Sequence, residues 1–187
     1  TAAGVTVSTS AGNSGPDAAT VAHRSPWLLS TAATSHNRKF TSEVDFSNPL
    51  YENILTLAGE NPFTTDVINS DVIYAGEDSG NDLGCVAFPA EFFKDSIALI
   101  KRGRCTFSEK ILNAEAAGAA GVLLFTDDRA PVAPSVSGTT IPGVMLDIPG
   151  TVGDALAAWV TAQSDETVSI SAFGALHSDD YADIMAD

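Results

Sequence analysis

Hydrophobic and polar residues alternate near the start of the chain in the pattern of short β-strands. Val5 to Thr9 alternates as a half-buried strand does, and Trp27 to Ala33 is a second β-compatible run. Between these runs, Asp17 to Pro26 is polar and rich in turn-forming residues. Residues 1–40 therefore predict a strand, a turn region and a second strand.

Longer apolar runs appear further along the chain. Ile97 to Ile100 is apolar at every position, which is typical of a central strand that is buried on both faces. Val122 to Phe125 is another buried strand, and a helical segment separates the two runs. This strand–helix–strand order predicts a right-handed crossover. Further strands are expected at residues 72–74, 141–146 and 168–172.

The clearest helix is predicted from Phe107 to Ala120. Thr106 and Glu109 have the spacing of a capping box, in which each side chain bonds the backbone amide of the other residue. A buried stripe is predicted at spacings of four, three and four residues, through Phe107, Ile111, Ala114 and Gly118.

A second helix is predicted from about Val152 to Gln163. Thr151 is the expected N-cap, because a threonine hydroxyl can accept a bond from an unpaired amide of the first turn. The predicted buried face consists of Val152, Leu156, Trp159 and Val160.

Composition limits the class of protein. The chain has 187 residues, 44% of them hydrophobic, which suits one domain with or without appendages. A net charge of −15 disfavours nucleic acid and anionic membrane surfaces as partners, and the basic stretch Lys101 to Arg104 is too short to reverse that. The chain starts on strand-like residues without a signal peptide, so we expect it to be a cut segment of a longer protein.

The two cysteines, Cys85 and Cys105, leave two alternatives open. A structural zinc site normally needs four ligands, and neither cysteine belongs to a Cys-x-x-Cys pair. Two buried free thiols would fit an intracellular protein. A disulfide would stabilise the fold by about 3 kcal/mol and would fit an extracellular one. We favour the disulfide.

Other polar residues carry no clear chemistry. Residues 77–82 predict a solvated acidic loop, because Gly80 and Leu83 break the register of an EF-hand calcium loop. No metal site or other cofactor site is therefore assigned. His23, His36 and His177 lie in polar, turn-like surroundings and are expected at the surface.

The stretch IALIKRGRCTFSEKILNAEAAGAAGVLLFTD, residues 97–127, resembles the signature of the protease-associated (PA) domain family. The family pattern matches at Arg102-Gly103-x-Cys105-x-Phe107, Lys110, Asn113-Ala114 and Ala117-Gly118-Ala119. The later IPGVMLDIPGTVGDAL resembles the family's next strand and second helix. The resemblance covers most of residues 50–170. It implies an α+β fold of twisted, partly closed β-sheets with two packed helices, and a Cys85–Cys105 disulfide.

Both ends of the chain resemble the core of subtilisin-like serine proteases (subtilases). GVTVSTSAGNSGP is similar to the segment that carries the oxyanion-hole asparagine, which implies that Asn13 is that amide in a parent enzyme. SPWLLSTAATSHNRKF resembles the following core strand, with Asn37 where the family usually has aspartate. The last residues, YADIMAD, resemble the strand that re-enters the core.

The motifs that carry the catalytic Asp, His and Ser of a subtilase are absent from this sequence. Gly12-Asn13-Ser14-Gly15-Pro16 resembles a nucleophile elbow only superficially, since proline replaces the last glycine. Ser14 is therefore not expected to be a nucleophile, and the segment by itself is expected to hydrolyse nothing. Subtilases commonly bind calcium elsewhere in their cores, so any calcium would belong to the parent.

These resemblances imply three parts: residues 1–40 from the protease core, residues 41–172 as the PA domain, and residues 173–187 returning to the core. The parent is expected to be a secreted endopeptidase acting on proteins or peptides. The PA domain would control substrate access, bind proteins or mediate self-association. The alternatives are a peptide-binding sorting receptor or a structural spacer that stabilises the core.

Overall fold

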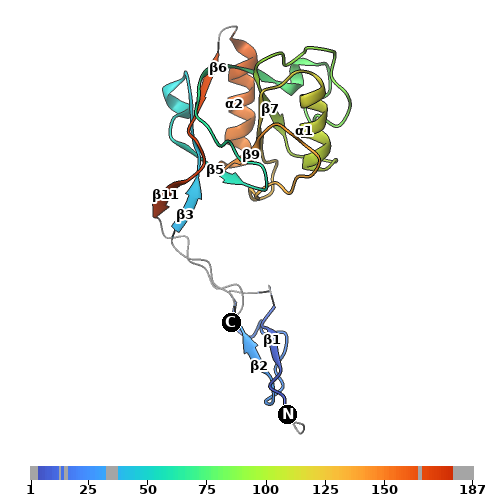
Figure 1. Cartoon of the computed structure of the whole chain (residues 1–187), viewed down its shortest axis with the longest axis vertical. Helices are drawn as coiled ribbons and strands as arrows, with labels where there is room; N and C mark the ends of the chain where they lie inside the picture. Colours follow the sequence, from blue (N-terminus) through green and yellow to red (C-terminus); the bar gives the residue numbers. More distant parts are fainter. Residues whose placement is uncertain (1–3, 13, 15–16, 33–37, 164–165, 179–187) are drawn as a thin grey trace. The chain divides into compact units, whose positions relative to one another are not determined.

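A computed structural model describes residues 4–12, 14, 17–32, 38–163 and 166–178 (Figure 1). The chain divides into two compact units. One comprises residues 1–39 and 176–187, and the other, here called the barrel unit, comprises residues 40–175. Each unit is described by itself below.

Seven strands of the barrel unit form a closed barrel. In chain order they are β4 (Glu43–Phe46), β5 (Ile54–Ala58), β6 (Val67–Tyr74), β7 (Ile97–Lys101), β8 (Gly121–Phe125), β9 (Gly143–Leu146) and β10 (Thr167–Ile170). Their order around the barrel is β10-β4-β5-β9-β8-β7-β6, with β6 to β9 parallel. The α+β class is confirmed.

The barrel is closed, which is compatible with the twisted, partly closed sheets that the family resemblance implied. Strand β10 closes it, because this strand pairs antiparallel with both β4 and β6. The pairing of β10 with β6 shifts register between Val168 and Ile170, which is the irregularity of a β-bulge, whereas the pairing with β4 is regular.

Helix α1 (Phe107–Ala116) connects the parallel neighbours β7 and β8, as the sequence predicted. The capping box is present: Glu109 N donates to Thr106 Oγ1 over 3.2 Å, and Thr106 N donates to Glu109 Oε2 over 2.9 Å. The helix ends earlier than predicted. Gly118 has φ +90° and donates to Glu115 O, while Ala119 donates to Ala114 O, which is a Schellman motif. Gly118 is therefore exposed rather than part of the buried stripe.

Helix α2 (Gly150–Ala162) corrects two predictions. Pro149 is its N-cap, and no side chain caps the helix, so the prediction for Thr151 is wrong. The buried face is Gly153, Leu156, Ala157 and Val160. It is rotated from the predicted face because Gly153 lies against the Phe125 ring, where an added Cβ would come within 2.3 Å of a ring carbon. Val152 is exposed and Trp159 is only partly buried.

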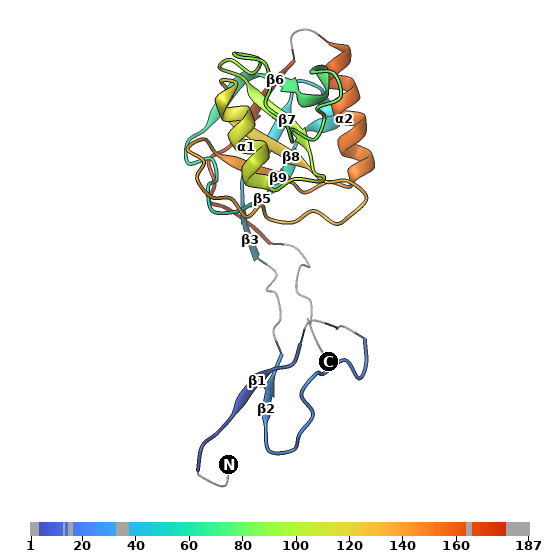
Figure 2. The ribbon, with the colours of Figure 1, turned by 90° about the vertical axis from the view of Figure 1, so that its right-hand side faces the viewer.

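Two hydrophobic cores lie on opposite faces of the central strands, which explains why every residue of β8 is buried. In one core, Leu123 and Phe125 of β8 share a cluster with Leu156 of α2. In the other, Leu124 shares a cluster with Ile111 of α1. Figure 2 shows the central strands between the two helices.

Short strands also occur outside the seven-stranded barrel. The chain enters the unit through β3 (Arg38–Thr41) and leaves it through β11 (Ala175–Ser178), and these two strands pair with each other. In the other unit, β1 (Ser8–Ser10) pairs parallel with β2 (Leu29–Thr31). Both strands lie within or next to the predicted runs and are shorter than them.

Candidate functional site

The segment that leads to Asn13 is described, but Asn13 itself lies outside the described residues. Strand β1 ends at Ser10, and the next residue, Ala11, is buried and donates from its amide to Thr31 O over 3.0 Å. Gly12 follows with φ +99°, and an added Cβ there would lie 3.2 Å from Ala22 Cβ. A glycine therefore turns the chain directly beyond the carboxyl end of a parallel strand. The catalytic role of Asn13 stays a prediction.

A second candidate site is a cleft in the barrel unit, where the parallel strands β8 and β9 end and α2 begins. Its volume is about 610 Å³. The lining residues come from three segments that follow or precede these elements: Asp127 to Pro131 after β8, Asp147 to Pro149 after β9, and Gly150 to Thr151 of α2. The carboxyl ends of parallel strands are a common place for ligands in α/β sheets.

An ion pair shapes the loop that forms one wall of this cleft. Arg129 donates to both carboxylate oxygens of Asp127, Nε to Oδ1 over 2.9 Å and Nη2 to Oδ2 over 2.6 Å. These bonds hold the pKa of Asp127 well below its usual range. Thr126 Oγ1 donates to Arg129 O over 3.0 Å, and Arg102 Nη1 donates to Ala130 O over 3.0 Å. The loop is thus tied to the end of β8 and to the residue after β7.

The chemistry of the cleft suits binding. Its walls are apolar at Ala130, Pro131, Ile148 and Pro149, and carboxylates of Asp128 and Asp147 border it. The lining residues include no histidine, cysteine or serine. Within the described part of the chain, no group of three or more His, Cys, Asp or Glu residues could hold a metal ion.

The two cysteines meet beside α1. Cys85 and Cys105 form a disulfide, with their Cα atoms 5.6 Å apart. Lys110 of α1 is completely buried next to it: its Nζ donates to Leu83 O and lies 3.8 Å from Cys85 Sγ. Burial lowers the pKa of Lys110 to about 8. The sequence did not predict this burial, although Lys110 precedes the buried Ala114 by one helical turn.

The prediction of a solvated acidic loop at residues 77–82 is only partly correct. Glu77, Ser79 and Gly80 are exposed, whereas Asn81 is buried. Its Nδ2 donates to Val86 O over 3.0 Å, and Val86 N donates to its Oδ1 over 3.3 Å, so this amide organises the loop. Among the histidines, His23 is exposed. His36 and the side chain of His177 lie outside the described residues.

Comparison with known proteins relates this part of the sequence to a family. The sequence profile of the PA domain matches residues 68–156, which run from β6 through the whole of α1 to the first turns of α2 and include the disulfide and the cleft. The chain contains a PA domain. The recognition of this family from residues 97–127 is confirmed.

Relatives of this PA-domain chain are peptidases of two kinds. It is 34% identical over 113 residues to the PII-type proteinase of Lactococcus lactis subsp. cremoris, which covers 59% of the chain and 6% of that protein. It is 26% identical over 178 residues to the subtilisin-like protease SBT1.4 of Arabidopsis thaliana, with 92% of the chain and 22% of that protein covered. It is 38% identical over 82 residues to the aminopeptidase YwaD of Bacillus subtilis (strain 168), with 43% of the chain and 17% of that protein covered.

The chain thus spans less than a quarter of each of these relatives. Among its described residues, no helix is both long and apolar enough to cross a membrane.

Proposed function

We propose that this chain is the PA-domain segment of a secreted subtilisin-like endopeptidase, with parts of the protease core at both ends. The observation that carries this proposal is the 178-residue match to a subtilisin-like protease, which covers 92% of the chain. A match of that extent must include part of residues 1–40, whereas the aminopeptidase match covers only 43%. The disulfide supports an oxidising, extracellular setting.

Asn13 would supply the oxyanion-hole amide of the parent. A neutral amide aimed at the developing negative oxygen lowers the barrier for attack by serine. Asn13→Ala in the full-length parent should lower kcat about 10²- to 10³-fold, which is the range measured for the corresponding asparagine of subtilisin. Ser14→Ala, one position along, is the matched control and should leave kcat unchanged. An unaltered kcat for Asn13→Ala would show that Asn13 does not supply the oxyanion-hole amide.

The PA domain itself would control which protein substrates reach the active site. It can be excised cleanly, because Gly174 N donates to Thr41 O over 3.2 Å, so the two ends of the unit lie side by side. Excision of residues 41–172 from the parent should change kcat/KM on folded proteins and leave short peptides nearly unaffected. A spacer that stabilises the core would instead lower thermal stability and activity on all substrates together.

We assign the substrate contact to the cleft between β8, β9 and α2, whose apolar walls suit an extended protein segment. Ala130→Trp would fill this cleft, and Ala90→Trp, also exposed, places the same side chain elsewhere on the unit. Only Ala130→Trp should change kcat/KM on folded proteins. Equal effects of the two variants would exclude the cleft. A membrane-spanning segment encoded in place of a triad would favour the sorting-receptor alternative.

A further inference from the structure

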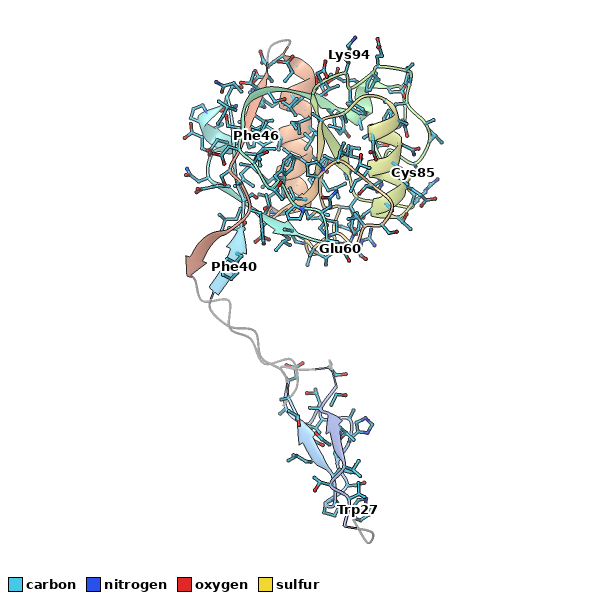
Figure 3. All side chains as sticks on the ribbon, in the orientation of Figure 1. Trp27, Phe40, Phe46, Glu60, Cys85 and Lys94 are labelled. Carbon is cyan, nitrogen blue, oxygen red and sulfur yellow. A yellow bond between two sulfur atoms is a disulfide. The ribbon has the colours of Figure 1, made fainter. Side chains whose placement is uncertain are left out.

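Lys110 is a completely buried lysine to which the proposed function gives no role. Lysine is rarely buried without a partner, because removing its charge from water is costly. Its ammonium donates to Leu83 O and faces Cys85, with Nζ 3.8 Å from Sγ (Figure 3 labels Cys85 beside α1). The disulfide carries no charge, so its contact with the Lys110 ammonium is not an ion pair.

The carboxylates around Lys110 keep the amine protonated at neutral pH. Asp82, Glu109 and Asp127 act on it through their negative charge and oppose the effect of burial. The pKa of Lys110 is therefore about 8 rather than lower. A positive charge stands beside Cys85 under physiological conditions.

Among the described residues, no lysine or arginine makes a corresponding contact with Cys105 Sγ. It precedes α1, and a helix N-terminus ordinarily lowers the pKa of a nearby thiol. Here Glu109 already occupies that end of the helix: its carboxylate accepts from Thr106 N over 2.9 Å. Glu109 and Arg104 are both exposed, so water and salt screen the charges of both. The two sulfurs of one disulfide thus differ in how well they carry negative charge.

We propose that the Cys85–Cys105 disulfide is a directed thiol-exchange site, where an external low-molecular-weight thiolate bonds to Cys105 and Cys85 departs. The attacking sulfur forms a bond to Cys105 Sγ, the Cys85–Cys105 bond breaks, and its electron pair goes to Cys85 Sγ beside the Lys110 ammonium. A second thiolate can then attack the mixed disulfide, which releases the Cys105 thiolate and the oxidised small thiol. Exchange is faster when the leaving thiolate is better stabilised.

The fold around the cysteines is held by bonds that do not depend on the disulfide. Lys110 Nζ bonds Leu83 O, and Asn113 Nδ2 donates to Gly84 O over 2.9 Å. Both donors lie on α1 and both acceptors directly precede Cys85. After exchange, an ion pair between the Cys85 thiolate and Lys110 replaces the covalent link, so the mixed disulfide on Cys105 forms without unfolding.

The direction of exchange is measurable on the chain of residues 1–187. Brief exposure to reduced glutathione at pH 7, an acid quench, alkylation and peptide mass spectrometry would locate the adduct. Glutathione should be on Cys105 in about tenfold excess over Cys85, because the better-stabilised thiolate leaves. Lys110→Met should bring the ratio close to one, and Lys110→Arg should preserve it. Lys94→Met is the control, since Lys94 is exposed at the surface in Figure 3.

A second measurement decides the matter if Lys110→Met does not fold. Cys105→Ser and Cys85→Ser each leave one thiol, whose pKa follows from the rate of iodoacetamide alkylation against pH. The Cys85 thiol should react about tenfold faster than the Cys105 thiol at pH 6.5. Adducts shared equally or favouring Cys85, a Lys110→Met ratio equal to wild type, or equal thiol pKa values would each overturn the proposal. Failure of the subtilase assignment would leave these results unaffected.

Discussion

Gly150, the first residue of α2, lies directly against the backbone of Asp127: an added Cβ would come within 1.8 Å of the Asp127 carbonyl oxygen. This contact joins the start of the helix to the segment that follows β8, and both residues line the cleft. Side-chain rearrangement cannot relieve it, because the blocking atom belongs to the backbone. The close approach explains why the helix begins on a residue without a side chain.

Gly150→Ala should therefore lower the free energy of unfolding by roughly 1–3 kcal/mol, the range for overpacking a closely packed site. Urea denaturation of the chain measures it. Thr151→Ala is the matched control: this exposed neighbour caps nothing, so its change should stay within about 0.5 kcal/mol. Equal stabilities for the two variants would contradict the contact.

The capping box of α1 yields a second prediction. Thr106→Ala removes the acceptor for Glu109 N and should cost about 1 kcal/mol. Glu109→Gln should cost less, because glutamine can still accept the bond from Thr106 N in this motif. Thermal unfolding monitored by circular dichroism compares the two. A larger loss for Glu109→Gln would show that charge outweighs the hydrogen bonds here.

The sequence predicted best those features that depend on neighbouring residues. The start of α1 was predicted correctly because Thr106 and Glu109 are three residues apart and bond each other. The start of α2 was not, because a contact with Asp127, distant in the sequence, determines it. Barrel closure likewise depends on β10, which pairs with strands that precede it by about a hundred residues.

The candidate sites also divide into features that the sequence revealed and features that depend on distant parts of the chain. The cysteine pair followed from the family resemblance, whereas the buried Lys110 was missed because a charged residue is expected at the surface. Burial of Asn81 depends on the loop bringing Val86 against it, which composition does not reveal. The cleft forms only where β8, β9 and α2 converge, so no single stretch of sequence encodes it.

Removal of the disulfide should destabilise the barrel unit. The two cysteines are 20 residues apart, and closing a loop of that size restricts the unfolded chain by about 3 kcal/mol. Cys85→Ala combined with Cys105→Ala should lower the free energy of unfolding by that amount in urea. Dithiothreitol should bring the wild type towards the same value and leave the double variant unchanged. A double variant as stable as the oxidised wild type would contradict this expectation.

The stability of the chain should also depend on pH through Lys110. Its pKa is about 8 in the folded state and 10.5 without the fold, so above pH 8 the unfolded chain binds more protons. Stability from this group therefore rises with pH across that window and is flat below it, with a gain on the order of 2 kcal/mol by pH 10. Below pH 8 the buried ammonium stays charged and unfavourable.

Urea denaturation at pH 7.0, 8.5 and 9.5 tests this dependence against Lys110→Met, which has no amine to titrate. The wild type should gain stability relative to the variant between pH 8.5 and 9.5, whereas Lys94→Met should track the wild type. Tyr74 does not affect this comparison. Burial raises its pKa to about 12, so the stability that its protonated form contributes is lost only as pH rises above 10. A constant difference between wild type and Lys110→Met at all three pH values would mean that the amine is solvated in the folded state.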